Sequence, residues 1–391
     1  WSHFSWYRAL VVDSPMAAIA AKLMGSKTAR IFHDHVLVKE PGNTVETPWH
    51  HDQPYYIVDG EQSVSFWVPL DQITRERSIE YVATSHKWRK SYTPKRFDGT
   101  DLYPNMKRKQ CTPKTLIGLQ ELKELGLINF DDDGMSLGSG ISLNEVANHP
   151  EIQKLYPALS KAASLVSAPQ LRNMGTIGGN LCLDTRCTYY NQTYPWRKAL
   201  GFCLKKDGDI CWVARSSPVC LAISSSDCAP VAVALNAEFH LTSKNGQRIT
   251  AAEDFYLNDG IDYLNKTHDE LLVSIRIPSH EGWLMGYKKL RKRDSIDFPV
   301  LSVATALQLD KAGVCKNARI VLGAVASCPQ RALQAETLLK GEKPNAELIE
   351  TSAIAAAKLA KPMDNTDMTL GYRKKMAANF VKEAINEALG Q

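Results

Sequence analysis

The chain has 391 residues, enough for two or three domains. Its apolar fraction of 44% and charged fraction of 23% indicate a folded protein and exclude a disordered one. A net charge of +5 spread along the chain argues against a nucleic-acid partner, and the sequence contains no apolar run of about 18 residues for a membrane span. The first residues show no signal-peptide pattern, so we expect a cytoplasmic protein that does not contact a membrane.

The composition is uneven along the chain. All nine cysteines follow residue 110, whereas residues 1–98 hold six of the ten histidines and five of the eight tryptophans. Such different chemistry predicts two unrelated modules that meet near Asp98 and Gly99.

The first module is expected to be β-rich. Strands are predicted over 29–39 and 63–71, with a turn at 41–43 after the first strand. Between these strands lie His50 and Asp52, which would share one face of an extended segment. A His and a carboxylate on one face supply two ligands of a 2-His-1-carboxylate Fe(II) site. Polar residues on a sheet edge explain the same spacing equally well.

The second module alternates strands and helices, which predicts a mixed α+β fold with a separate C-terminal subdomain. A capping box at Ser142–Glu145 opens one helix, and the last fifty or so residues are expected to be helical. The other predicted elements are a hairpin of 128–130 with 135–137, a helix over 153–166, a hairpin of 231–242 with 247–250, and strands at 271–277, 300–309 and 318–324.

A glycine-rich segment at 172–180 is the first candidate binding motif. Closely spaced glycines let backbone N–H groups approach a phosphate, although adjacent glycines also form ordinary tight turns. The spacing is that of neither a Rossmann nor a P-loop motif. The upstream segment 99–102 offers a second backbone cradle, so a dinucleotide pyrophosphate would lie between the two loops.

Four cysteines form the second candidate site. Cys187, Cys203, Cys211 and Cys220 are separated by 15, 7 and 8 residues, in a stretch with few helix or strand signals. Four thiolates are the ligand set of a [4Fe–4S] cluster, and the spacing is not that of a zinc site. Spacing alone leaves a cluster and scattered buried thiols equally open, whereas disulfides are disfavoured without a secretory signal.

Three further motifs carry a resemblance: G-T-D-L at 99–102, T-I-G-G-N-L at 176–181 and D-C-A-P at 227–230. Residues 99–391 resemble the FAD-binding subunits of the xanthine dehydrogenase and carbon monoxide dehydrogenase class. The segment 181–192 and the four-cysteine register are similar to the β subunits of 4-hydroxybenzoyl-CoA reductases, which carry a [4Fe–4S] cluster on an inserted loop. The resemblance implies a PCMH-type FAD-binding domain over 99–280, with its cysteine loop at 187–220, and a CO dehydrogenase flavoprotein-type C-terminal α+β domain over 281–391.

The same resemblance implies roles for individual residues. Cys187, Cys203, Cys211 and Cys220 would be the cluster ligands, and the chain would carry no catalytic residue of its own. The implied FAD-binding residues are Gly99, Thr100, Asp101, Thr176, Gly178, Gly179, Asn180, Asp227 and Lys289.

The implied function is electron transfer in an aromatic acyl-CoA reductase. The partners would be a large subunit with the molybdenum cofactor, a small [2Fe–2S] subunit and a ferredoxin-like electron donor. An acidic donor is expected to be attracted by Lys198, Lys205 and Lys206, which also fit an ordinary solvated charged face.

The first module carries W-H-x-D-x-P-Y-Y at 49–56 and F-W-V-P-L-D at 66–71. These motifs resemble the phytanoyl-CoA dioxygenase family of Fe(II)/2-oxoglutarate oxygenases, which implies that His50 and Asp52 ligate iron in a partial double-stranded β-helix. The family's distal His and 2-oxoglutarate-binding Arg have no counterpart before the second module begins. We therefore expect a truncated segment over 1–98, with a dioxygenase as the alternative function.

The junction itself leaves two explanations open. The oxygenase-like segment replaces the strand and helix that begin the FAD subunits, so part of the pyrophosphate loop is expected to be lost. A gene fusion, or a joining artefact in which neither module works fully, fits the sequence as well.

Overall fold

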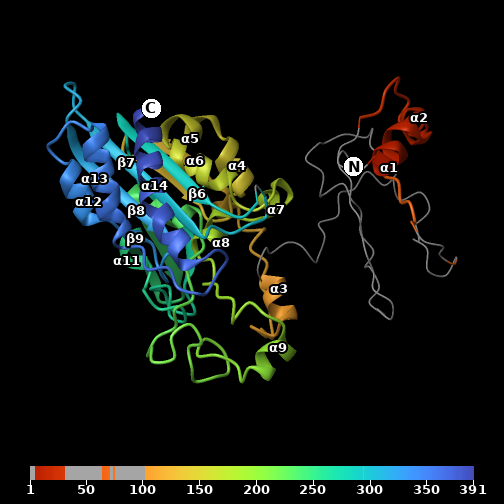
Figure 1. The fold of residues 1–391 in the computed structure, drawn as a ribbon, viewed down its shortest axis with the longest axis horizontal. Coiled ribbons are helices and arrows are strands. Elements are labelled where there is room, and N and C mark those ends of the chain that lie inside the picture. Colours follow the sequence, from red (N-terminus) through yellow and green to blue (C-terminus); the bar gives the residue numbers. More distant parts are fainter. Residues whose placement is uncertain (1–4, 31–63, 71–73, 75–101, 294) are drawn as a thin grey trace. The chain divides into compact units, whose positions relative to one another are not determined.

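The computed structural model describes residues 5–30, 64–70, 74, 102–293 and 295–391 (Figure 1). The chain divides into two compact units, Trp1–Pro94 and Lys95–Gln391.

The described part of the first unit is mainly helical. It contains α1 (Ser5–Arg8), a π-helical turn (Ala9–Asp13) and α2 (Met16–Leu23). The strand predicted over 63–71 is wrong in its described part, because residues 64–70 have no regular structure. A segment becomes a strand only when a neighbour completes its hydrogen-bond ladder, which the alternation of side chains does not guarantee. Most of the strand predicted over 29–39 lies outside the described residues, as do His50 and Asp52.

The second unit opens with a five-stranded antiparallel sheet of order β1-β2-β5-β3-β4. The hairpin predicted at 128–137 is confirmed, since Ile128 pairs with Leu137 and Asp131 with Gly134. Gly134 has a φ of +137°, and a Cβ there would lie 2.1 Å from the carbonyl oxygen of Ile277, so the turn requires glycine. The strands are β1 (Ile128–Asp131), β2 (Gly134–Gly138), β3 (Glu238–Ser243), β4 (Gly246–Ala251) and β5 (Leu271–Pro278).

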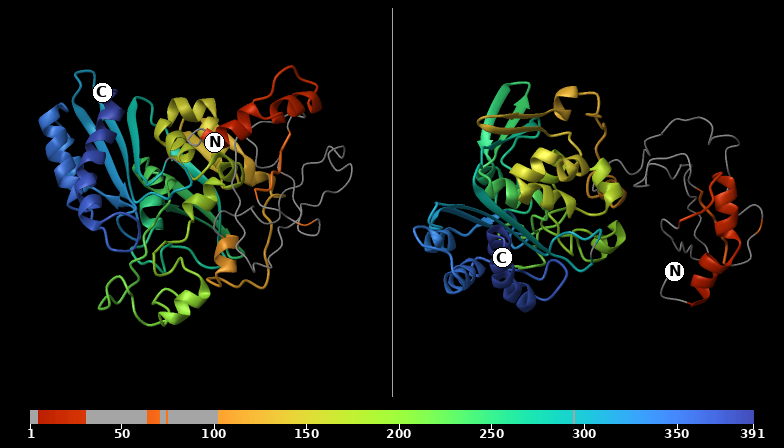
Figure 2. Two further views of the ribbon diagram at one scale, coloured as in Figure 1. Left: turned by 45° about the vertical axis from the view of Figure 1, so that its right-hand side comes forward. Right: turned by 90° about the horizontal axis from the view of Figure 1, so that it is seen from above.

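Short helices pack around this sheet (Figure 2). The Oγ of Ser142 accepts a hydrogen bond from the N–H of Glu145 at 3.1 Å, which confirms the predicted cap. The short helices of this part of the chain are α3 (Leu102–Lys107), a 3₁₀ turn (Lys123–Gly126), α4 (Leu143–Asn148), α5 (Pro150–Leu155), α6 (Pro157–Ser164), α7 (Pro169–Met174), α8 (Ile177–Leu181), α9 (Tyr194–Ala199), α10 (Cys228–Ala234) and α11 (Ala252–Phe255). Of these, α3 and α9 lie away from the sheet (Figure 1).

Two predicted elements in this region need correction. The helix expected over 153–166 is divided into α5 and α6, because Pro157 has no N–H and disfavours a helical conformation at Tyr156. The strand expected from residue 231 begins only at Glu238, because residues 228–234 form α10. Every residue of α10 is buried, so its sequence shows no polar face that would distinguish a helix from a strand.

The C-terminal part is a four-stranded antiparallel sheet of order β6-β7-β8-β9, covered on one face by α12, α13 and α14 (Figure 1). Alternate residues of β7 face opposite ways: Val303 and Leu307 pack toward these helices, and Ala304 and Ala306 toward the first sheet's core. The elements are β6 (Trp283–Leu290), β7 (Leu301–Leu309), β8 (Cys315–Gly323), β9 (Gln330–Arg331), α12 (Leu333–Leu339), α13 (Ala346–Ala357) and α14 (Leu370–Leu389).

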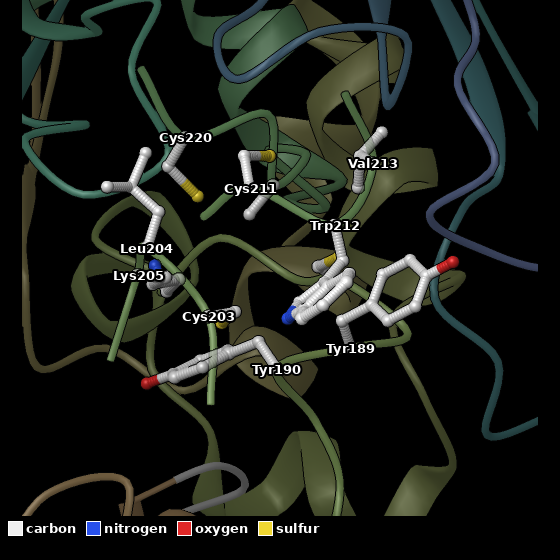
Figure 3. Close-up of a pocket in the computed structure, with 11 residues that line it drawn as sticks. Tyr189, Tyr190, Cys203, Leu204, Lys205, Cys211, Trp212, Val213 and Cys220 are labelled. Atoms are coloured by element: carbon white, nitrogen blue, oxygen red, sulfur yellow. The ribbon is translucent and has the colours of Figure 1, made fainter. Parts of the chain in front are cut away.

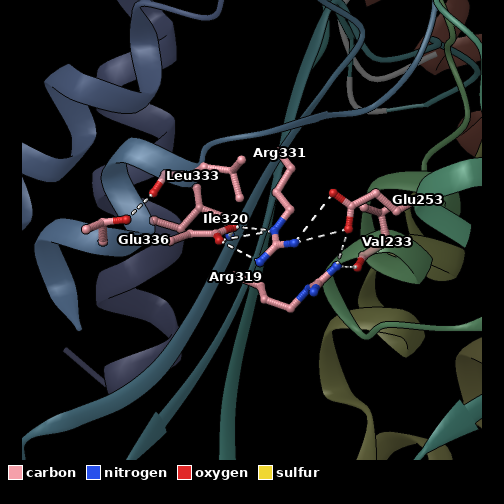
Figure 4. A network of polar contacts seen from close by, with 8 residues as sticks. Val233, Glu253, Arg319, Ile320, Arg331, Leu333 and Glu336 are labelled. Carbon is pink, nitrogen blue, oxygen red and sulfur yellow. Dashed lines mark hydrogen bonds and ion pairs between the residues drawn. The ribbon is translucent and has the colours of Figure 1, made fainter. Parts of the chain in front are cut away.

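A polar network joins the two parts of this unit (Figure 4). Glu253 of α11 accepts hydrogen bonds from Arg319 of β8 at 3.0 Å and from Arg331 of β9 at 3.1 Å. Arg331 also binds Glu336 of α12 at 2.9 Å. The two halves therefore share charged contacts as well as the apolar packing of β7.

Within the described ranges, no helix combines the length and the apolar character that a membrane span requires.

Candidate functional site

A long loop between α8 and α10 carries the four candidate cysteines. It is largely irregular, with α9 as its one helix, and both its ends are tied to the rest of the unit. Arg186 and Ile223 form an antiparallel bridge. The N–H of Thr188 donates to the Asn365 carbonyl at 2.9 Å, and the Asn365 amide donates to the Leu221 carbonyl at 2.7 Å. The loop is thus anchored against the C-terminal part.

Arg197 holds α9 in place from inside. Its side chain is 1% exposed, and its Nη2 donates to the carbonyl of Arg108 at 2.7 Å. Its guanidinium also lies over the rings of Tyr194 and Phe202, at 5.8 and 5.9 Å. A buried guanidinium with these contacts fixes the outer end of the loop against the segment that follows α3.

The cysteine side chains converge on one cavity (Figure 3). Cys187, Cys203, Cys211 and Cys220 are between 5% and 8% exposed, although 15, 7 and 8 residues separate them. The other five cysteines do not line this cavity. The remaining lining residues are Tyr189, Tyr190, Leu204, Lys205, Trp212, Val213 and Ala222. The fold therefore selects the four cysteines that the sequence register singled out.

The thiols are held in a dry environment. Burial raises the pKa of Cys187 to about 12 and that of Cys220 to about 11. The backbone N–H groups of Tyr189 and Tyr190 lower the pKa of Cys187 and so oppose the effect of burial. The N–H of Ala222 lowers the pKa of Cys220 in the same way. Such N–H groups beside sulfur favour the thiolate, the form that binds iron. The donor set therefore fits an iron–sulfur cluster.

The described residues contain no group of three or more His, Cys, Asp or Glu side chains arranged to hold one metal ion. A four-iron cluster takes one thiolate at each iron, so its four cysteines surround a volume and do not converge on a point.

Lys205 is the one charged residue among those that line the cavity, and its side chain is 6% exposed. Its Nζ donates to Oδ1 of Asp184 at 2.7 Å and to Oγ1 of Thr185 at 2.6 Å. The third contact is the carbonyl of Gly260 at 2.5 Å. The expectation that Lys205 attracts an acidic donor at the surface is wrong, because its ammonium points inward.

Gly260 backs one of the four thiols. Its N–H donates to the carbonyl of Cys220 at 2.8 Å. A Cβ at this position would lie 2.7 Å from Sγ of Cys220 and 2.8 Å from the amide nitrogen of Ala222. Only glycine fits here without a shift of one of these groups.

The glycine-rich segment forms the turn into α8. Oγ1 of Thr176 accepts from the N–H of Gly179 at 3.0 Å, and the N–H of Gly178 donates to the Ser139 carbonyl at 2.9 Å. The Asn180 Oδ1 accepts from Ser226 at 2.8 Å. Gly179 is exposed, whereas Gly178 and Asn180 are buried with their polar atoms in internal contacts. The surface available to a phosphate is therefore the turn around Thr176 and Gly179.

Asp227 and Lys289 lie together, although 61 positions separate them in the sequence. Their ion pair of 3.0 Å joins the start of α10 to β6, with side chains 3% and 1% exposed. The hydroxyl of Tyr287 donates to Asp227 at 2.8 Å. Burial raises the pKa of Asp227 and lowers that of Lys289, while each charge opposes the effect on the other.

Five predicted site residues cannot be placed, because they lie outside the described residues. They are Gly99, Thr100 and Asp101 of the predicted second cradle, and His50 and Asp52 of the predicted iron site.

Sequence reasoning missed Lys205 as an interior charge and Gly260 as the support of Cys220. Lys205 stands beside Lys206, and the pair looks like a solvated patch. Gly260 lies 40 residues after Cys220, in a loop with no pattern of its own. Only the contact between the two loops distinguishes these residues.

Comparison with known proteins agrees with this architecture. Residues 97–280 match the model of the FAD binding domain in molybdopterin dehydrogenase, and residues 286–388 match that of the CO dehydrogenase flavoprotein C-terminal domain. Residues 7–116 match the phytanoyl-CoA dioxygenase model. These matches confirm both resemblances, and the first and third matches overlap over residues 97–116.

Two curated relatives extend the similarity over most of the second unit. An aldehyde oxidoreductase FAD-binding subunit of Escherichia coli is 30% identical, over 74% of this chain and 91% of the relative. The carbon monoxide dehydrogenase medium chain of Hydrogenophaga pseudoflava is 27% identical, over 74% of this chain and 87% of the relative.

A solved structure of carbon monoxide dehydrogenase from the same organism superposes with a TM-score of 0.60 at 26% identity, covering 75% of this chain and 88% of that chain. These likenesses define an FAD-binding oxidoreductase subunit. The chain belongs to the FAD-binding subunits of the molybdenum hydroxylase family, whose members include carbon monoxide, xanthine and nicotinate dehydrogenases.

Proposed function

We propose that this chain is the FAD- and [4Fe–4S]-carrying electron-transfer subunit of a molybdenum-dependent aromatic acyl-CoA reductase, most similar to 4-hydroxybenzoyl-CoA reductase. One observation carries the proposal: four cysteines spread over 34 residues line one buried cavity. A purely structural loop does not require four free thiols around one cavity, whereas a cluster does.

The cysteine cavity suits a bound cluster in its chemistry. Thiolates must form before iron binds, so the raised pKa values of Cys187 and Cys220 mean that metal binding must release protons there. The aromatic side chains of Tyr190 and Trp212 limit access of water to the sulfurs. When bound, the cluster and FAD supply one-electron and two-electron redox chemistry.

For FAD, we propose that the exposed turn at Thr176 and Gly179 binds the pyrophosphate, together with Gly99, Thr100 and Asp101. Gly178 and Asn180 shape this turn through their internal hydrogen bonds. Asp227 and Lys289 bind each other, so we assign them to positioning the joint between α10 and β6 beside the cofactor, without direct contact to it.

The proposed partners are a large molybdenum-cofactor subunit, a small [2Fe–2S] subunit and a ferredoxin-like donor. The relatives are medium chains and FAD-binding subunits, which supports a multi-subunit assembly. Lys198 and Lys206 remain candidates for attracting an acidic donor. Nine free cysteines suit the reducing cytoplasm, where we place the complex.

A second function is favoured by the dioxygenase match over residues 7–116. In this alternative, His50 and Asp52 bind Fe(II) and the first unit is a truncated 2-oxoglutarate-dependent dioxygenase. A single chelatable iron without sulfide or flavin would support it.

The test is anaerobic purification followed by quantitation of iron, acid-labile sulfide and flavin. We expect about four irons, about four sulfides and about one FAD per chain. Cys203→Ser should abolish the cluster absorbance and leave flavin in place. Cys111→Ser is the matched control, since Cys111 does not line the cavity. Wild-type protein without sulfide, or equal sulfide in both variants, would contradict the proposal.

A further inference from the structure

Lys205 stands out because it places a full positive charge inside an otherwise uncharged cavity. We propose that Lys205 is a positioning residue of the four-cysteine site: it holds Cys220 through Gly260, and its fixed charge favours the reduced state of the cluster. This inference rests on the proposed function, since it requires a cluster in the cavity.

The ammonium of Lys205 is held in one place. An ammonium has three N–H donors, and all three meet acceptors, namely Asp184, Thr185 and Gly260, at 2.5 to 2.7 Å. Its Nζ also lies 4.8 Å from the ring centroid of Tyr190 and 5.2 Å from that of Tyr263. Such a charge acts as a fixed part of the site and not as a mobile surface group.

The contact with Gly260 reaches the ligand. The carbonyl of Gly260 accepts from Lys205, and its N–H donates to the carbonyl of Cys220. A Cβ at Gly260 would lie only 2.7 Å from the Cys220 sulfur, so the two residues are closely packed. Lys205 thereby clamps the loop at 257–264 onto the cysteine loop. The Gly260 carbonyl also accepts from the Thr185 hydroxyl at 2.5 Å, so loss of Lys205 removes one of the hydrogen bonds that hold the support behind the Cys220 thiol.

The charge also acts directly on the site. At 6% exposure, Lys205 is little screened by solvent, whereas its partner Asp184 is 28% exposed and also accepts a hydrogen bond from the Tyr190 hydroxyl at 3.1 Å. The Lys205 Nζ lies 2.5 Å from the carbonyl oxygen of Gly260, the residue packed behind the Cys220 sulfur, and Lys205 lines the same cavity as the four thiols. Because reduction adds negative charge to a cluster, a nearby cation stabilises the reduced form.

Lys205→Met removes the charge and keeps most of the side-chain volume. Lys206→Met is the matched control, because the adjacent Lys206 is 38% exposed and pairs with Asp207 at 3.3 Å. The readout is the midpoint potential of the cluster in an EPR-monitored redox titration. We expect Lys205→Met to disfavour reduction about tenfold, a shift of about 59 mV to lower potential for one electron. Lys206→Met should shift the potential much less.

Each outcome has a distinct meaning. Wild-type protein without iron and sulfide overturns the proposed function, and the inference with it. A wild-type cluster whose potential is the same in Lys205→Met and Lys206→Met overturns the inference alone. If Lys205→Met loses the cluster or does not fold, the test moves to Lys205→Arg, which keeps the positive charge. A wild-type potential in Lys205→Arg supports the inference. A folded Lys205→Arg protein that lacks the cluster, or whose cluster has a lowered potential, overturns it.

Discussion

Gly260 offers a sharp test of how tightly the cysteine cavity is built. In a Gly260→Ala variant, the new Cβ would lie 2.7 Å from Sγ of Cys220, 2.8 Å from the Ala222 nitrogen and 2.9 Å from the Ala222 Cβ. Ordinary contact begins at 3.4 Å, so these approaches are too close by about 0.5 to 0.7 Å. Gly260 does not have a positive φ, so the cost is steric and not conformational.

The energy of this clash follows from which atoms can move. The Ala222 atoms belong to the main chain or are attached directly to it, whereas the Cys220 sulfur can rotate away. We expect overpacking to lower the free energy of unfolding by about 1–3 kcal/mol. We also expect the cluster content to fall, since the displaced sulfur is a proposed ligand.

The assay combines urea unfolding with measurement of iron and sulfide per chain. Gly126→Ala is the control, because a Cβ at Gly126 meets nothing within 4 Å and Gly126 has no positive φ. Gly260→Ala protein with the stability and sulfide content of Gly126→Ala would refute the reasoning that Gly260 supports Cys220.

Two further predictions concern charges away from the cavity. Lys289→Met leaves the buried carboxylate of Asp227 without its cation and should lower the free energy of unfolding, measured by urea unfolding, by about 3–5 kcal/mol. Adding Asp227→Asn to the same chain should restore most of that loss. A loss below about 1 kcal/mol in Lys289→Met, or a double variant whose loss is the sum of the two single losses, would contradict this prediction. Hydrogen bonds from Arg248 lower the pKa of Glu270 from 4.5 to about 2, so its contribution to stability is complete above pH 4.5 and is lost as the pH falls toward 2. The melting temperatures of wild type and Glu270→Gln should therefore converge over that range, and a constant difference would contradict this assignment.

Local signals predicted the elements whose geometry depends on nearby residues. The hairpin at 128–137 and the cap at Ser142 are confirmed, because turn chemistry and capping act over a few positions. The two failures within the second unit have different origins. α10 is buried on all sides and has no polar face, and Pro157 divides what looked like one helix.

The candidate site also contains features that the sequence indicated and features that only the structure shows. Spacing alone left a cluster and scattered thiols equally open, and the resemblance in register implied Cys187, Cys203, Cys211 and Cys220 as the ligands; the structure brings these four thiols to one cavity. The glycine-rich turn was also visible, but the sequence did not show that Gly178 and Asn180 direct their polar atoms inward.

By itself, the sequence determined the class of this protein, because the short motifs at 99–102, 176–181 and 227–230 carry the resemblance to FAD-binding subunits without knowledge of the fold. Only the tertiary structure decided that Lys205 turns inward, that Gly260 supports Cys220, and that Asp227 pairs with Lys289. The physical reason is distance along the chain. The partners in the last two contacts are 40 and 62 positions apart along the chain, and no local propensity carries information over that range. Lys205 has the same local surroundings as the exposed Lys206, so burial by other loops alone distinguishes them.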